Sequence, residues 1–325
     1  MPAPLLGRRI LDLGAVCARL PHGLAAAFAG KLCADYGAEV VRPIPCGEPL
    51  ASCAPLLPAG GSALDRFLNS RKHSRPPSGR FDAAIGDASA VAAHPDVPVQ
   101  VRISVLGPGE DPVSSELEVL ALSGLLELVG EPEGPPARLA GHQLAYAAGL
   151  AACAGLLAAL RRGRRETVDV SLFDVAVWLN WKAPASLLML GQAPQRRNPR
   201  DMWMTVPAKD GHVALVFQEK DWPSLRAMIG DPALDDARFG TLSGRCEFRQ
   251  DLLAVLRPWF AARTRAEITR DAQARRVPIG PVMWPAELLE DAQHRARGFL
   301  ESDGTPRPPV IWDGHRLPMG EVNAQ

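Results

Sequence analysis

The sequence predicts an α/β protein in which a large Rossmann-like domain with a parallel sheet is joined to a smaller α+β domain. Three observations lead to this prediction. A strand, a helix and a second strand follow one another within the first 44 residues, and strands then alternate with helices to about residue 190. After a polar stretch at residues 192–201, the pattern changes to a hairpin followed by helices.

The opening strand–helix–strand unit sets the direction of the sheet. Ile10–Leu13 is a short apolar strand, Pro21–Tyr36 has apolar residues at helical spacing, and Ala38–Ile44 returns to a strand. A helix between two strands predicts a right-handed crossover and a parallel sheet. The turn after the first strand lacks the glycine pattern of a dinucleotide site, so a nicotinamide or flavin dinucleotide is not expected.

The alternation continues through the rest of the large domain. Further strands are expected at Phe81–Ile85, Val97–Val105 and Thr167–Ser171. Helices are expected at Glu116–Leu128, Gln143–Arg162 and Leu172 to about Leu190.

The polar stretch at residues 192–201 contains prolines and arginines and marks the domain boundary. We therefore predict a large domain at residues 1–200, a small domain at 201–285 and a return to the large domain at 286–325. The small domain should begin with a hairpin at Val206–Phe217, because Lys209-Asp210-Gly211 separates two apolar runs. Its helices are expected at Trp222–Ile229, Cys246–Ala262 and Arg265–Arg275, and the chain from Ile279 onward should be rich in loops.

Composition narrows the possible partners. Of the 325 residues 47% are hydrophobic, and 36 basic residues balance 36 acidic ones, so no overall field favours nucleic acid or an anionic membrane. The six cysteines are scattered singly and predict no metal site. Leu144–Leu160 is uncharged but short for a membrane span, and the N-terminus lacks a secretory h-region. We expect a cytoplasmic protein.

Several separated segments carry a family resemblance. Gly30–Val41 reads GKLCADYGAEVV, Glu116–Gly124 reads ELEVLALSG, Val168–Asp174 reads VDVSLFD, and Val277–Val282 reads VPIGPV. In this order they resemble the family III CoA-transferases, also called the CaiB/BaiF family, which includes formyl-CoA transferase, carnitine-CoA transferase and the α-methylacyl-CoA racemases.

This resemblance implies the reaction and the assembly. It implies acyl-CoA thioesters and carboxylic acids as small-molecule substrates, with coenzyme A as a substrate and no covalently bound cofactor. It also implies an interlocked homodimer, with pairing to an intact homologous subunit as the alternative.

The resemblance also identifies a missing group. The nucleophilic aspartate of the family corresponds to Ala145, which has no carboxylate to attack a thioester. Glu116, Glu118, His142 and Tyr146 flank the matching segments and could replace it. We take His142 and Glu116 as the catalytic candidates, although carboxylates at a helix start are also common as caps, and a polar residue before a helix needs no catalytic role.

Five residues are candidates for CoA binding. The resemblance implies that the backbone of Val16 and Ala18 lines the CoA chain. Arg42, Arg71 and Lys72 could neutralise its phosphates, or could form a solvated basic face.

Three functions stay open at this point. The first is a CoA-transferase-like enzyme with a non-standard active site, and the second is a catalytically degenerate homologue that serves as a binding or partner subunit. The third is a CoA-ester lyase or isomerase that uses His142. Trp178, Trp181 and Trp203 are expected in the core, with an acyl pocket or an interface as alternatives.

Overall fold

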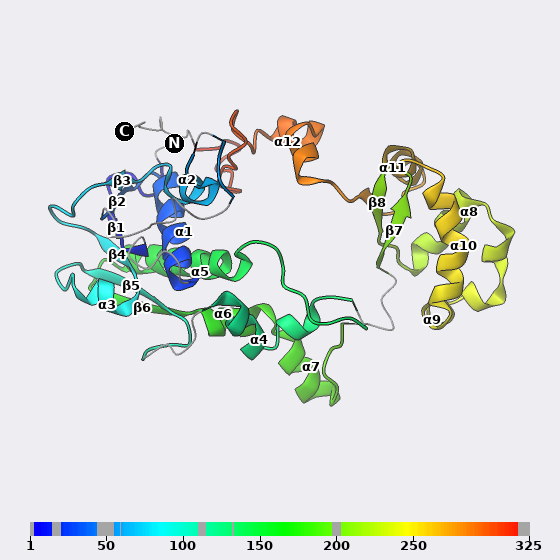
Figure 1. Cartoon of the computed structure of the whole chain (residues 1–325), viewed down its shortest axis with the longest axis horizontal. Coiled ribbons are helices and arrows are strands. Elements are labelled where there is room, and N and C mark those ends of the chain that lie inside the picture. Colours follow the sequence, from blue (N-terminus) through cyan, green and yellow to red (C-terminus); the bar gives the residue numbers. More distant parts are fainter. Residues whose placement is uncertain are drawn as a thin grey trace. The chain divides into compact units, whose positions relative to one another are not determined.

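A computed structural model of the chain describes residues 3–14, 21–43, 55–58, 60–109, 115–131, 133–196 and 203–317. The chain forms two compact units, one from Met1–Arg196 and Phe299–Gln325 and the other from Arg197–Gly298 (Figure 1). The first contains a six-stranded parallel sheet and the second a three-stranded antiparallel sheet. The predicted α/β class, with a large parallel-sheet domain and a smaller one, is confirmed.

The parallel sheet has the strand order β3-β2-β1-β4-β5-β6. Its strands are β1 (Arg9–Asp12), β2 (Glu39–Arg42), β3 (His73–Ser74), β4 (Ala83–Gly86), β5 (Val99–Ser104) and β6 (Glu166–Ser171). The order reverses between β1 and β4, and ligands of such sheets bind beyond the carboxyl ends of the strands at this reversal. Leu13 and Gly14 follow β1, and residues 15–20 after them lie outside the described residues.

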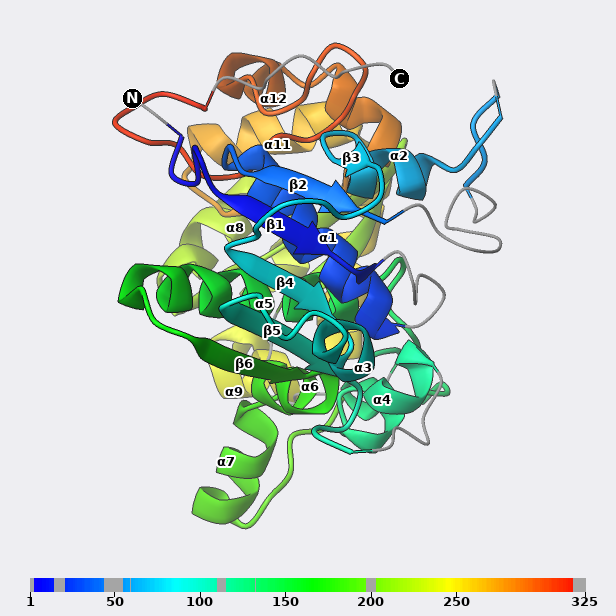
Figure 2. The same cartoon turned by 90° about the vertical axis from the view of Figure 1, so that its left-hand side faces the viewer.

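The side chains of successive strand residues point to opposite faces of this sheet. Ile10 and Ile85 pack into the core under helices α1 (Pro21–Asp35) and α5 (Gln143–Arg162), whereas Leu11 and Ala84 pack on the face that carries α3 (Ala88–Ala92). Figure 2 looks onto the sheet, with α3 in front of it and with α1 and α5 behind it. The strands are therefore buried on both faces.

Helix α5 lies in this core. Leu144, Ala148, Ala152 and Leu156 are almost completely buried and contact α1 or the sheet. Among the described residues α5 is the one helix whose length and apolar composition would allow a membrane span, and the most apolar 18-residue stretch of it is 44% buried. These contacts make it a core helix in this structure.

Gly149 allows α1 and α5 to approach each other closely. A Cβ atom at this position would lie 2.7 Å from the carbonyl oxygen of Ala25 and 3.0 Å from the ring of Phe28. Gly149→Ala should therefore destabilise the fold by about 1–3 kcal/mol, although alanine favours a helix more than glycine does. Urea denaturation measures this effect.

Ala154→Gly is the matched control, because Ala154 is an exposed position of the same helix. It should cost about 1 kcal/mol through helix propensity alone. If Gly149→Ala stabilised the protein, the close helix contact would be contradicted.

Two predicted helices are shorter in the structure. Leu172 to Leu190 forms two helices, α6 (Leu172–Leu179) and α7 (Lys182–Leu190), with Asn180 between them. Glu116–Leu128 divides into α4 (Glu116–Leu122) and the 3-10 turn η3 (Leu126–Leu128), because Gly124 takes a left-handed conformation with φ +73°. The connection from β5 to β6 thus holds α4, η3 and α5.

The sequence analysis missed two short helices in the first unit. Ser62 caps α2 (Ala63–Asn69), and Asp87 caps α3. Each cap side chain accepts a hydrogen bond from a backbone N–H of the first turn. The helices are only 7 and 5 residues long, which is too short for a clear apolar period.

The second unit starts with the predicted hairpin, formed by β7 (Met204–Ala208) and β8 (Gly211–Leu215). A third strand, β9 (Ile279–Pro281), pairs with β8 and comes from the tail that we expected to be rich in loops. The predicted helix Cys246–Ala262 is α9 (Leu242–Glu247) and α10 (Arg249–Ala261), joined at Phe248. The other helices are α8 (Trp222–Ile229), α11 (Arg265–Ala274) and α12 (Ala292–Arg297).

Candidate active site

The two catalytic candidates meet at the start of α5. Glu116 is the first residue of α4, and His142 directly precedes α5. Although 26 residues separate them in the chain, His142 Nδ1 lies 3.4 Å from Glu116 Oε2. The β5–β6 connection therefore places a carboxylate beside an imidazole.

Glu116 is held in place by the backbone of α5. Its Oε1 accepts a hydrogen bond of 2.8 Å from the N–H of Leu144, in the first turn of that helix. The positive end of the helix dipole lies at this turn, where it attracts a negatively charged group. The Glu116 side chain is only 9% exposed, whereas that of His142 is 37% exposed, so the imidazole is the more accessible group.

The two other candidates for the missing carboxylate have different surroundings. Glu118 is exposed and accepts a hydrogen bond from Ser115 Oγ, which fits a cap of α4. The Tyr146 ring packs 4.9 Å from that of Phe28, centre to centre, and meets the His142 ring edge-on. Burial raises the pKa of the Tyr146 hydroxyl, and the charge of Glu116 adds to this shift.

Ala145 is completely buried in the core. It lies one residue beyond Leu144, whose N–H binds Glu116. The position that resembles the family's nucleophile is therefore next in sequence to a carboxylate-binding site but faces apolar neighbours.

Lys72 lies in the interior rather than at a phosphate-binding surface. Its Nζ is 2.5 Å from Asp12 Oδ2 at the end of β1, and it donates a hydrogen bond of 2.6 Å to the Ala27 carbonyl. The two charged side chains are 0% and 1% exposed. Burial lowers the pKa of Lys72, and the Asp12 carboxylate opposes this shift. Lys72 is therefore paired with a buried carboxylate in this structure.

Arg71 is also engaged with carboxylates. It lies 3.4 Å from Asp35 and 2.9 Å from Glu301, and Asp35 is bound in addition by Lys31. Burial raises the pKa of Asp35, and the neighbouring Lys31 opposes the shift. Nothing in the sequence analysis indicated these partners, since Glu301 is 230 residues away.

Arg42 is the predicted phosphate ligand with the weakest ion pair. It donates a hydrogen bond of 2.8 Å to Ser74 Oγ, and its guanidinium is 3.6 Å from Asp65. Val16 and Ala18, the predicted backbone contacts of CoA, lie outside the described residues.

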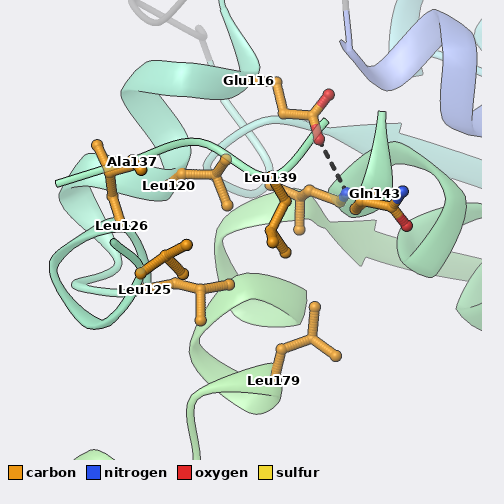
Figure 3. Close-up of a pocket in the computed structure, with 10 residues that line it drawn as sticks. Glu116, Leu120, Leu125, Leu126, Ala137, Leu139, Gln143 and Leu179 are labelled. Atoms are coloured by element: carbon orange, nitrogen blue, oxygen red, sulfur yellow. Dashed lines mark hydrogen bonds between the residues drawn. The ribbon is translucent and has the colours of Figure 1, made fainter. Parts of the chain in front are cut away.

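An apolar pocket adjoins Glu116 (Figure 3). Eight of its ten lining residues are apolar, namely Leu120, Leu125, Leu126, Val129, Ala137, Leu139, Leu144 and Leu179, and the other two are Glu116 and Gln143. The empty space among them measures about 410 Å³, including the open mouth. The sequence analysis missed this pocket, because its residues come from four separate segments without a common period.

The three tryptophans expected in the core are exposed instead. Trp178, Trp181 and Trp203 are 74%, 60% and 60% exposed, and none lines the pocket. The prediction of burial is wrong for all three. The regular spacing of apolar residues in the sequence did not show which helix faces are buried and which are exposed.

Comparison with known proteins identifies the family. The sequence profile of CoA-transferase family III matches residues 77–320. Succinate–glutarate CoA-transferase of Agrobacterium fabrum is 27% identical over 63% of this chain and 54% of its own length. Succinyl-CoA–D-citramalate CoA-transferase of Chloroflexus aurantiacus is 25% identical over 91% of this chain and 82% of its own length. The chain spans about half the length of several curated relatives that it matches.

A solved structure shares the fold. The crystal structure of a CaiB/BaiF family protein from Brucella suis superposes with a TM-score of 0.83 at 21% identity, and the match covers 98% of this chain and 95% of that one. The profile match spans three quarters of the sequence. The chain therefore belongs to CoA-transferase family III.

Proposed function

We propose that this protein transfers CoA between carboxylic acids and that Glu116 supplies the carboxylate which Ala145 lacks. The contact between Glu116 and His142 beside an apolar pocket carries this proposal. Glu116 is held by Leu144 through one oxygen, so its other oxygen can act as the nucleophile.

The proposed reaction proceeds by acyl exchange on Glu116. Oε2 attacks the thioester carbonyl, the C–S bond breaks, and CoA thiolate leaves behind a mixed anhydride. The thiolate then attacks the Glu116 carbonyl, which releases the donor acid as a carboxylate and forms a glutamyl–CoA thioester. The acceptor carboxylate runs the same two steps in reverse and regenerates Glu116. The exchange consumes no proton and involves no oxidation or reduction.

His142 is proposed to position Glu116. An imidazole N–H 3.4 Å from Oε2 can hold the carboxylate in one orientation for attack. The first turn of α5 contributes the positive end of its dipole.

CoA is the only cofactor-like molecule in this proposal, and it acts as a substrate. We keep Arg42 and the backbone of Val16 and Ala18 as its proposed contacts. Arg71 and Lys72 are left out, since their charges face Asp35, Glu301 and Asp12. We propose the cytoplasm as the location, in keeping with the free thiols of Cys33 and Cys153.

Trapping of the covalent intermediate tests the proposal. The protein is incubated with an acyl-CoA and then with hydroxylamine, which converts a glutamyl thioester or anhydride to a hydroxamate. Peptide mass spectrometry should find the hydroxamate at Glu116, and CoA exchange between two acids should be measurable in a parallel sample without hydroxylamine. A hydroxamate at another residue, or CoA binding without exchange, would exclude the role of Glu116.

A non-catalytic partner subunit is the second candidate, and the complete burial of Ala145 favours it. Glu116 would then serve only to cap α5. Exchange that requires addition of an intact homologue would support this alternative.

We also propose that the chain forms a homodimer through α6 and α7. Every residue of α7 is at least partly exposed, and Leu188 and Met189 are 86% and 82% exposed. Trp178 and Trp181 of the same segment are exposed as well, and exposed apolar side chains that are close together often mark protein interfaces.

Replacing Leu188 and Met189 together by glutamate should weaken this dimer about 100-fold or more, because each buried apolar side chain contributes about 1.5–3 kcal/mol. Light scattering during size-exclusion chromatography measures the mass. Leu6→Glu is the control, since Leu6 is 68% exposed elsewhere in the same unit. An unchanged mass for the double variant would place the interface on another surface.

A further inference from the structure

The pocket beside Glu116 also bears on which acyl group is transferred, and this inference rests on the proposed function. Figure 3 shows Glu116 at one end of the pocket and Leu179 toward the opposite end. An acyl group whose carbonyl lies at Glu116 would extend its tail among Leu120, Leu126 and Leu179.

The charges around this pocket discriminate between acyl groups. Among the lining residues that the structure describes there is no lysine or arginine, and Glu116 is the one charged group. A second carboxylate on the acyl group would lose its water without a cation to pair with, and Glu116 would repel it. A hydrocarbon tail carries no charge, so it neither loses bound water at a cost nor is repelled by Glu116.

Two described arginines lie near the pocket residues, Arg138 in sequence and Arg196 through its contacts, and neither is among the lining residues. Arg196 donates to the Gly134 carbonyl at 2.6 Å and lies 3.2 Å from Glu127, so its charge is already paired. Arg138 follows Ala137 and precedes Leu139, but its side chain is exposed. Among the described residues, Arg138 is therefore the cation through which a dicarboxylate could still be recognised at the mouth.

The free pocket also exposes apolar surface that a hydrocarbon would cover. Leu139 and Leu179 are 54% and 44% exposed although they line the same space. Each methylene group that is buried there should improve binding about fourfold.

We infer that the site takes the acyl group of a hydrophobic monocarboxylic acid and rejects dicarboxylic acids. Glu116 and Gln143 provide the polar end of the pocket, and the leucines of α4, η3 and α6 select the tail. Specificity then lies in the β5–β6 connection and the end of α6.

The first test compares kcat/KM for hexanoyl-CoA, butyryl-CoA and succinyl-CoA with a common acceptor acid. Hexanoyl-CoA should exceed butyryl-CoA about 15-fold, because it adds two methylene groups, and succinyl-CoA should fall about 100-fold below hexanoyl-CoA. A preference for succinyl-CoA would overturn the inference, and its loss in Arg138→Ala would identify the responsible cation.

A charge placed in the pocket should alter this preference. Leu139→Arg supplies the missing cation at a half-exposed position and should narrow the ratio of hexanoyl to succinyl transfer about tenfold or more. Leu122→Arg is the matched control, because Leu122 is 60% exposed on α4 and does not line the pocket. Equal ratios in both variants would exclude the pocket as the acyl site.

Binding separates this inference from the proposed function. Saturation-transfer NMR with free hexanoate and free glutarate needs no turnover. Binding of hexanoate alone, which is lost in Leu139→Arg, supports the inference even if no thioester is exchanged, in which case only the proposed function fails. Binding of glutarate alone, or of neither acid, overturns the inference.

Discussion

Replacing Glu116 by glutamine is expected to lower kcat for CoA exchange about 1000-fold or more. An amide cannot form the anhydride or the thioester, and loss of a covalent nucleophile on this scale corresponds to about 4 kcal/mol of transition-state stabilisation. The fold should be preserved, because the amide oxygen can still accept the hydrogen bond from the N–H of Leu144. Initial rates of CoA exchange and a urea denaturation curve are measured on the same preparation.

Glu118→Gln is the control for this prediction. Glu118 lies in the same first turn of α4 but is exposed and bound to Ser115, so the variant should exchange CoA at nearly the wild-type rate. If Glu116→Gln retained full activity while Glu118→Gln lost it, the nucleophile would be Glu118. If both variants remained active, Glu116 would be a cap of α5 only.

Replacing Lys72 by methionine should reduce the free energy of unfolding by about 3–5 kcal/mol. The change removes the ammonium that faces Asp12 and leaves this carboxylate buried with a hydrogen bond from the N–H of Gly14. Asp12→Asn combined with Lys72→Met should recover most of the loss, because no unpaired charge remains and the amide oxygen can still accept that hydrogen bond. Denaturation with urea compares the variants.

An exposed ion pair provides the contrast. Arg66 and Asp303 are 60% and 42% exposed, so Arg66→Ala should cost less than about 1 kcal/mol. If Lys72→Met cost no more than this, Lys72 would not be part of a buried pair, and its predicted role at a CoA phosphate would become tenable again.

The sequence predicts those helices and strands whose apolar residues recur regularly over a long segment. The opening unit from β1 to β2 and helix α5 were predicted within a few residues, because their buried positions recur regularly. The short helices α2 and α3 were missed, since a polar cap and one or two buried residues define them. The break between α6 and α7 was missed because apolar residues continue through both helices.

Only those residues of the candidate site that lie beside family-like segments could be predicted from the sequence. Glu116 and His142 could be proposed because they flank segments that resemble a known family, and the structure adds their contact. Arg71 and Lys72 were expected to face phosphates, but their partners Glu301 and Asp12 lie far away in the chain. A local pattern does not reveal whether a cation faces solvent or a distant buried carboxylate.

The connection between β5 and β6 carries nearly all of the candidate site. It carries Glu116, His142 and every pocket residue except Leu179, and its two ends are anchored on adjacent parallel strands. A change confined to this segment would alter both the proposed reacting group and the fit of the tail, while the strand order of the sheet stays the same. In the proposed function, one continuous segment thus supplies the reacting carboxylate and most of the surface that selects the acyl tail.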